Sequence, residues 1–235
     1  MVHSAESKRM WDAAADWWSR HLRSDPNRLD QVFPMVEAML GDVAGKRILD
    51  AGAGEGTFAR RLRQRGAHTT GVDFSRLISF AKVEEQTVNV PAIQYVESEI
   101  ADLSPGCLGE PFDAAVCLLV LHCCPDINAT LRALRGQMNI GATLVVCDLH
   151  PEYIHSYSRL WRSFRKDGPN KYSVQISDEA PAVLLFHHPK ESLALGFATA
   201  HFEILEIHEP VSPRVPDVPG AFPLFIYYTL RSCAL

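Results

Sequence analysis

The chain contains 235 residues, of which 47% are hydrophobic and 22% are charged, and its formal net charge at pH 7 is −5. This composition is typical of a folded globular protein and excludes a predominantly disordered, collagen-like or coiled-coil chain. The acidic balance argues against nucleic acid as a partner, and no apolar run approaches the ~20 residues that a membrane span needs. The polar N-terminus does not resemble a signal peptide. The cysteines form no CxxC pair, so we expect reduced thiols in a cytoplasmic protein.

Apolar periodicity predicts helices and strands that alternate along most of the chain. Two helices are expected first, over residues 7–22 and 29–40. The predicted strands that follow cover residues 47–50, 68–73, 93–96, 112–119 and 142–148. Helices are predicted after the first, second and fourth of these strands; Ser75 is the expected N-cap of one, and another spans 126–138. Such alternation predicts right-handed βαβ crossovers and a mostly parallel sheet.

The alternation breaks after Pro151. Residues 151–189 are predicted to hold a basic, aromatic helix over 157–166, a turn at 167–170 and two short strands. A helix over 191–196 and strands over 202–208 and 224–230 then complete the sheet, with the last two strands antiparallel. We therefore expect a single α/β domain over residues 1–235, in which residues 151–189 form an inserted cap that binds the substrate, because long insertions in compact domains are usually functional.

A glycine-rich segment, Asp50-Ala51-Gly52-Ala53-Gly54-Glu55-Gly56, lies between the first strand and its helix. Glycines suit a tight turn where a ligand approaches bare backbone. Asp73 ends the next strand, where doubly wound folds hold the hydroxyls of a ribose. Asp50 would repel the pyrophosphate of a dinucleotide but would pair with an ammonium group. The segment therefore favours S-adenosylmethionine (SAM) over a nicotinamide cofactor.

These motifs resemble those of the class I SAM-dependent methyltransferases. Asp148-Leu149-His150-Pro151 and Phe186-His187-His188-Pro189 look like the elements that flank the cap in the small-molecule branch of that family. Residues 48–56 look like the first motif of that family and residues 71–75 like the second. Residues 112–116, followed by Leu121-His122, resemble the fourth-strand motif, and residues 141–146 resemble the fifth strand. The resemblance covers about residues 11–230. It implies a Rossmann-like, seven-stranded, mostly parallel sheet with the last strand antiparallel, helices on both faces and the cap after the fifth strand. N-terminal helices commonly cover the SAM pocket in that family, so the resemblance also implies that residues 1–40 form a helical lid.

The resemblance also implies a set of cofactor-binding residues. In this set the glycine-rich segment holds the methionine end of SAM, the Asp73 carboxylate holds the ribose, and Phe74 lies against the adenine. Glu99 departs from the family pattern but can still accept a hydrogen bond from the adenine amine, and Leu118 offers only its backbone. The full expected set is Trp11, Asp50, Ala51, Gly52, Ala53, Gly54, Gly56, Asp73, Phe74, Glu99, Ile100 and Leu118.

Three histidines are candidates for a general base. His150 follows the fifth strand, where open α/β sheets place their ligands, and His188 lies at the return of the cap. His122 follows the fourth strand. An imidazole at any of these positions could accept a proton near neutral pH. No histidine spacing suits zinc, so no metal is expected.

The sequence therefore predicts an enzyme that transfers a methyl group from SAM to an oxygen or nitrogen of a small-molecule metabolite, chiefly by aligning the two reactants. Two alternatives stay open. One is a nicotinamide-dependent oxidoreductase, and the other is a SAM-binding protein that transfers no methyl group, because a fold does not fix a function. Neither the acceptor nor the oligomeric state follows from the sequence.

Overall fold

The structure is a computed structural model that describes residues 2–87, 93–152, 161–211 and 223–234. Its helical segments are α1 (Val2–Ser24), the π-helix η1 (Arg28–Val32), α2 (Phe33–Leu40), α3 (Thr57–Gln64), α4 (Leu77–Glu85), the short 3₁₀ helices η2 (Ile100–Asp102) and η3 (Leu121–Cys123), α5 (Ile127–Gly136) and α6 (Lys190–Thr199). Its strands are β1 (Arg47–Ala51), β2 (His68–Asp73), β3 (Gln94–Glu97), β4 (Phe112–Leu118), β5 (Met138–Leu149), β6 (Ser163–Lys166), β7 (Lys171–Gln175), β8 (Val183–Phe186), β9 (Phe202–His208) and β10 (Phe225–Ser232). Among the described residues, no helix has both the length and the apolarity that crossing a membrane requires.

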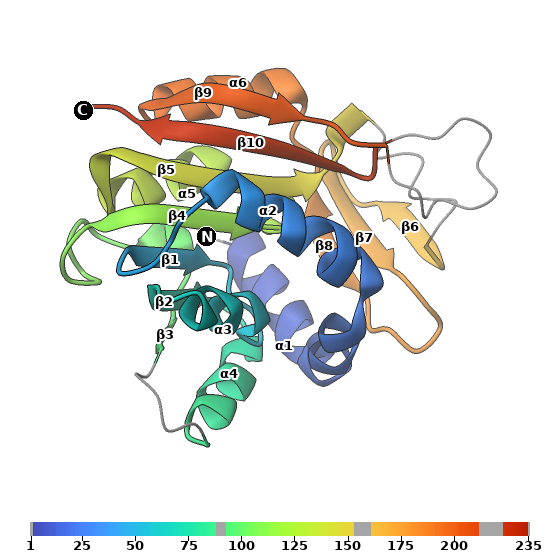
Figure 1. Ribbon diagram of the computed structural model, residues 1–235. Helices are drawn as coiled ribbons and strands as arrows, with labels where there is room; N and C mark the ends of the chain where they lie inside the picture. The colour runs from blue at the N-terminus through green and yellow to red at the C-terminus, as the bar shows by residue number, and fades with distance from the viewer. Residues whose placement is uncertain (1, 88–92, 153–160, 212–222, 235) are drawn as a thin grey trace.

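Seven strands form one sheet in the order β3-β2-β1-β4-β5-β10-β9 (Figure 1). Neighbouring strands from β3 to β5 are parallel, whereas β10 runs antiparallel to both β5 and β9. The predicted fold class, with its antiparallel last strand, is confirmed. The strand order reverses between β1 and β4, and open α/β sheets bind their ligands beyond the carboxyl ends of the strands at such a switch point.

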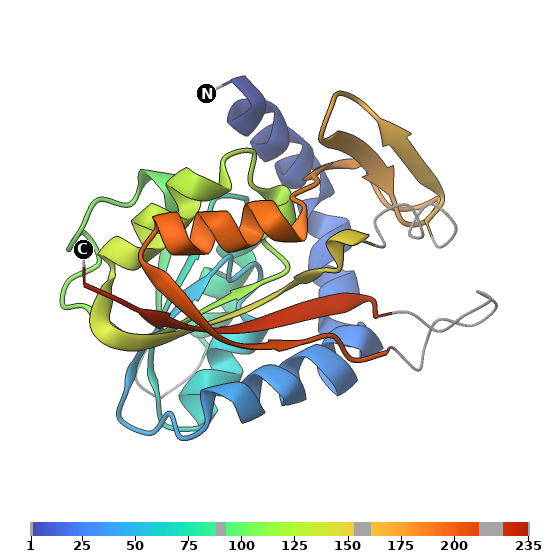
Figure 2. The same cartoon turned by 90° about the horizontal axis from the view of Figure 1, so that it is seen from above.

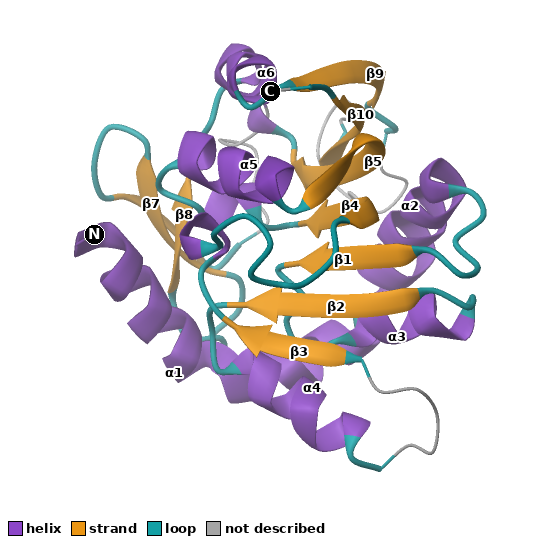
Figure 3. Ribbon diagram, turned by 90° about the vertical axis from the view of Figure 1, so that its left-hand side faces the viewer, coloured by secondary structure: helices purple, strands orange, loops and turns teal. Residues whose placement is uncertain are grey.

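Helices cover both faces of this sheet (Figure 3). Side chains of α5 and α6, such as Leu131 and Phe197, pack into one apolar cluster with the strands. On the opposite face, Phe33 of α2 and Phe58 of α3 pack into a second cluster, and their rings lie 4.9 Å apart. The central strands are buried on both faces, which explains why β1 and β4 have continuous apolar runs rather than alternating patterns.

The segment expected to form a cap contains a separate antiparallel sheet, β6-β7-β8, which lies beside α1 (Figure 2). The predicted helix over 157–166 is wrong for Ser163–Lys166, because these residues form β6; residues 157–160 lie outside the described part of the chain. Pairing with β7 explains the error. Phe164 packs onto Tyr172 of that strand at a ring distance of 4.8 Å, whereas Ser163, Arg165 and Lys166 are exposed.

Two further boundaries differ from the sequence prediction. The helix expected to begin at Ser75 begins at Leu77, with Arg76 at the N-cap position. The Ser75 hydroxyl still accepts the Leu77 N–H at 3.3 Å, and it also donates a hydrogen bond to the Asp73 carboxylate at 2.7 Å. The second helix is split by a π-helical turn that ends at Val32, next to the α-helical segment that contains Pro34.

The N-terminus of α5 supplies a test of the local structure. The Asp126 carboxylate accepts the Ala129 N–H at 3.0 Å and caps the helix. We expect Asp126→Ala to lower the free energy of unfolding by about 1 kcal/mol, because one backbone donor loses its partner, and Asp126→Asn to retain most of the stability. Urea denaturation of both variants measures the difference. Equal stability of wild type and Asp126→Ala would show that the cap contributes nothing.

Candidate active site

The turn between β1 and α3 forms the floor of the candidate site. Gly52, Gly54 and Gly56 have φ angles of +85°, +56° and +82°, a region that residues with a side chain rarely adopt. The Gly52 N–H donates to the Val72 carbonyl at 2.7 Å, which fixes the turn to β2. A Cβ atom at Gly52 would lie only 2.1 Å from Cγ2 of Val120. The turn therefore requires glycine for both its backbone conformation and its close contact with the end of β4.

Asp50 is buried directly before this turn. Its side chain is 2% exposed, and its Oδ2 has no hydrogen-bond partner among the described residues. Burial raises the pKa of Asp50 to about 7; the nearby Arg28 guanidinium opposes this shift, and the carboxyl groups of Glu55 and Asp73 add to it. A buried carboxylate with an unused oxygen is a site for a cationic ligand, and an ammonium group would supply both the charge and the donor that it lacks.

Two charged residues beside Asp50 were not predicted from the sequence. Arg28 lies on η1, and its guanidinium is 3.7 Å from a carboxylate oxygen of the fully buried Glu55. Arg28 occurs between two predicted helices, where no motif singles it out. Glu55 lies inside the glycine-rich segment, but only the fold shows that its side chain points into the protein. The Arg28 guanidinium thus acts on the carboxyl groups of Asp50 and Glu55, with Asp73 close by, and this acidic cluster favours a ligand with positive charge.

Asp73 is held at the end of β2 by three hydrogen bonds. Its Oδ2 accepts the Gly54 N–H at 2.9 Å, and its Oδ1 accepts the backbone N–H and the hydroxyl of Ser75 at 2.8 and 2.7 Å. Burial raises the pKa of Asp73, although these bonds act in the opposite direction. Each carboxylate oxygen has lone pairs for more than one donor, so a fixed carboxylate of this kind can still accept the hydroxyls of a diol.

The other residues expected to bind the cofactor lie at the carboxyl ends of the parallel strands or in the core directly beneath them. Phe74 follows β2 and is half-buried, and Glu99 lies between β3 and η2. Ile100 and Leu118 are 8% and 9% exposed and pack into the two apolar clusters of the sheet. Their side chains therefore belong to the core below the site.

Helix α1 lies across the carboxyl ends of β2 and β3. Lys8 donates to the Phe74 carbonyl and to the Glu97 carboxylate, and Asp12 accepts the Arg76 N–H at 2.6 Å. Further along the helix, Trp11 packs against the small sheet. Its indole ring is 5.3 Å from that of Trp18, and the N–H groups of both rings are buried without a hydrogen-bond partner among the described residues.

His122 and Asp148 pair where β4 and β5 end. Asp148 is 3% exposed and accepts the His122 backbone N–H at 2.9 Å, and the same carboxylate also bonds to Nδ1 of the His122 ring. Burial disfavours the charged imidazole, but the Asp148 carboxylate outweighs this effect and raises the pKa of His122 well above its ordinary value. The sequence singled out His122 but assigned no role to Asp148, since the contact joins residues 26 positions apart.

His188 lies in the same region. Its Nε2 bonds to the Cys124 carbonyl at 2.8 Å, and burial lowers the pKa of the ring. A small cavity of about 20 Å³ separates the end of β5 from the start of α6, and this volume is roughly that of one water molecule. The residues that line it are His122, Asp148, Leu149, Pro151, Phe186, His187, His188 and Leu193. Two of the three histidines predicted as bases therefore share one cavity.

His150 has different surroundings. Its side chain is fully buried, its Nε2 lies 3.6 Å from Oε1 of Glu209, and its backbone N–H donates to the Leu224 carbonyl at 2.9 Å. Burial lowers its pKa, although Glu209 opposes the shift. Glu209 is also paired with Lys190. His150 thus contacts the segments that follow β9 and precede β10, and it does not line the cavity between His122 and His188.

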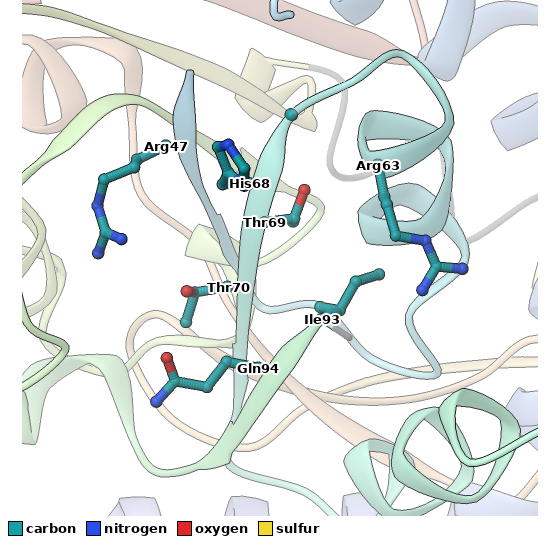
Figure 4. Close-up of a pocket in the computed structure, with 8 residues that line it drawn as sticks. Arg47, Arg63, His68, Thr69, Thr70, Ile93 and Gln94 are labelled. Atoms are coloured by element: carbon teal, nitrogen blue, oxygen red, sulfur yellow. The ribbon is translucent and has the colours of Figure 1, made fainter. Parts of the chain in front are cut away.

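A larger cavity, of about 180 Å³, lies at the amino ends of the parallel strands (Figure 4). Arg47 and His68, the first residues of β1 and β2, line it together with Arg63, Thr69, Thr70 and Gln94. Because ligands of open α/β sheets bind at the carboxyl ends of the strands, we place the active site at the smaller cavity and the glycine-rich turn. Within the described ranges, no three His, Cys, Asp or Glu side chains are grouped to hold a metal ion.

Comparison with known proteins gives consistent matches. Residues 19–206 match the model of a family described as a methyltransferase domain. A ubiquinone biosynthesis O-methyltransferase from Acinetobacter baumannii is 29% identical over 133 residues, which are 54% of this chain and 55% of that protein. The chain thus spans about half the length of this curated relative.

Two solved structures share the fold. An S-adenosylmethionine-dependent methyltransferase from Mesorhizobium loti superimposes with a TM-score of 0.66 at 23% identity, covering 86% of this chain and 99% of that one. A magnesium protoporphyrin IX methyltransferase from Synechocystis PCC 6803 with bound SAM gives a TM-score of 0.67 at 16% identity, covering 98% and 97% of the two chains.

The burial of Asp50 predicts how stability depends on pH. Its pKa in the folded protein, about 7, is above the ordinary value of 3.8, so the folded protein binds this proton more tightly than the unfolded chain does. The free energy of unfolding therefore falls as the pH rises from 3.8 to 7. We expect Asp50→Asn to exceed the wild type in free energy of unfolding at pH 8 by roughly 1–3 kcal/mol, and the gain to shrink at pH 5. Urea denaturation at both values measures it, with the exposed Asp102→Asn as control. A gain that does not change with pH would contradict the assignment.

Proposed function

The chain belongs to the methyltransferase-domain family, and we propose that it transfers a methyl group from S-adenosylmethionine to a small-molecule metabolite. The observation that carries this proposal is the buried Asp50 carboxylate beside a glycine-rich turn, whose Oδ2 has no hydrogen-bond partner in the part of the chain that the structure describes. Phosphate-bearing cofactors do not fit there, because three buried carboxyl groups would repel them. SAM fits, because it carries an ammonium group and a sulfonium and has no phosphate.

Each part of SAM has a counterpart among the residues of the site. Asp50 would hold the ammonium group, and Arg28, whose guanidinium lies 3.7 Å from Glu55, would pair with the carboxylate. The Asp73 carboxylate would accept the ribose hydroxyls, while Phe74 and Glu99 would contact the adenine. The cofactor supplies a methyl group made electrophilic by its positive sulfur. The remaining expected contacts, with Ala51, Gly52, Ala53, Gly54, Gly56, Ile100, Leu118 and the lid residue Trp11, are proposals of the same kind.

The acceptor side lies between the small sheet and the ends of β4 and β5. Aromatic side chains of α1, of β7 and of the residues before β6, including Trp11, Tyr172 and Trp161, form an apolar cluster there, and such surroundings would suit a small organic molecule. The name of the Acinetobacter relative supports an oxygen as the methylated atom. The bases proposed from the sequence are His122, His150 and His188. A cytoplasmic location and the absence of a nucleic-acid partner remain predictions.

The charge of Asp50 predicts a pH-dependent affinity for the cofactor. An ammonium ligand binds the ionised carboxylate, so we expect the affinity for S-adenosylhomocysteine to rise with pH, by up to about tenfold per unit below pH 7, and to level off above it. In Asp50→Asn the affinity should be low and independent of pH. Isothermal calorimetry between pH 5.5 and 8.5 measures this. Strong, pH-independent binding by the wild type would refute the role of Asp50.

Turnover tests the function itself. We expect methyl-labelled SAM to give labelled small molecules when the protein is incubated with a metabolite extract, and Asp73→Ala to give none, because each lost bond to a charged acceptor costs about 1.5–3 kcal/mol. Mass spectrometry detects the products, and circular dichroism checks that the variant is folded. Binding of SAM without any labelled product would favour a SAM-binding protein. A response of tryptophan fluorescence to NADH but not to SAM would favour the oxidoreductase.

A further inference from the structure

The cavity at the ends of β4 and β5 brings together two imidazoles with different partners. His122 bonds through Nδ1 to the Asp148 carboxylate, and His188 bonds through Nε2 to the Cys124 carbonyl. These bonds leave Nε2 of His122 and Nδ1 of His188 to face a ligand, with the Cys123 thiol as a further side-chain hydrogen-bond partner of the His122 ring. The cavity has room for about one oxygen atom with its hydrogen.

We propose that the acceptor is a hydroxyl compound whose reacting oxygen lies in this cavity, where His122 donates a hydrogen bond to it and His188 takes its proton. Asp148 is the positioning residue for His122. This inference rests on the proposed function and adds to it the reacting group of the acceptor and the separate roles of the two rings. It assigns no catalytic role to His150.

The surroundings of His122 keep its ring protonated. Its charge is balanced by Asp148, which receives both the backbone N–H and the Nδ1–H of His122. The other titratable groups that face it are the Cys123 thiol on the same helical turn and the His188 ring. Since the pKa of His122 is raised well above its ordinary value, Nε2 carries a hydrogen at neutral pH and acts as a donor.

The surroundings of His188 keep its ring neutral. A backbone carbonyl can only accept, so the hydrogen of the neutral ring lies on Nε2 and the lone pair lies on Nδ1. Burial and the neighbouring His122 and His187 rings lower the pKa of His188, while Asp148 opposes them. A neutral imidazole beside a charged one provides a base and a donor in one cavity, which is how paired titratable groups acquire separate roles.

A hydroxyl group matches this pair better than an amine does. A hydroxyl oxygen has two lone pairs, so it can accept the hydrogen bond from His122, donate its hydrogen to His188 and still attack with the remaining pair. An amine nitrogen has one lone pair, and the His122 donor would occupy it. In the step, the hydroxyl proton moves to Nδ1 of His188 and an oxygen lone pair forms the new C–O bond. The bonding pair of the broken C–S bond stays on sulfur, which becomes a neutral thioether.

Proton NMR of the histidine rings tests the charge states without cofactor or acceptor. We expect one ring, absent from His122→Gln, to titrate well above the ordinary range, and another, absent from His188→Gln, to titrate below it. In Asp148→Asn the midpoint of His122 should fall by about 1–3 pH units, because an opposite charge has been removed. His68→Gln, at the amino end of β2 and away from this cavity, controls for general effects of losing a histidine. The assignment is overturned if both rings titrate together or if Asp148→Asn leaves the midpoint of His122 in place.

Products and the pH profile of turnover test the roles. We expect O-methyl products and, at saturating SAM so that the titration of Asp50 does not limit turnover, a bell-shaped profile. Its acid limb should be lost in His188→Gln and its alkaline limb moved to lower pH in Asp148→Asn. Asp148→Glu, which keeps the charge, should restore the alkaline limb. An N-methyl product, or loss of the acid limb in His150→Gln, overturns this inference and leaves the proposed function standing. The absence of any labelled product contradicts the proposed function, and this inference with it.

Discussion

The hydrogen bond from the Gly54 N–H to the Asp73 carboxylate joins the glycine-rich turn to the end of the neighbouring strand. It connects two segments that belong to different βα units, and it can form only if the turn adopts positive φ angles. The same carboxylate orients Ser75, whose hydroxyl accepts the first N–H of α4 at 3.3 Å. The turn, the strand end and the start of the next helix thus share one buried anion, so the position of each fixes the others.

Much of the fold follows from local pattern. Strands β2 and β9 lie where the sequence places them, because their apolar residues are bounded by clear turn signals. The antiparallel last strand and the class I methyltransferase family are confirmed. The glycine-rich turn was predictable for the same reason, since its backbone conformation depends on its own residues. The domain boundaries and the residues assigned to the cofactor remain predictions.

Interactions between distant segments could not be predicted in this way. Arg28 reaches Glu55 from another helical segment, and Asp148 reaches His122 from the next strand. No spacing in the sequence records either pairing. The wrong helix at Ser163–Lys166 has a related cause, because its basic residues have good helix propensity, yet pairing with β7 decides the conformation. In the sequence, His150 follows a predicted strand just as His122 does. Only the fold shows that Glu209 lies beside His150.

The cluster of carboxyl groups around the turn also has a consequence for selectivity in a living cell. The most abundant adenosine compounds of metabolism, ATP and the nicotinamide dinucleotides among them, share the adenine and ribose that we propose the end of β2 holds. What separates them from SAM is the sign of charge a few ångströms beyond the ribose. Asp50, Glu55 and Asp73 are all buried, so their field is weakly screened by salt. Electrostatic repulsion from these three side chains would therefore exclude competitors that shape alone would admit.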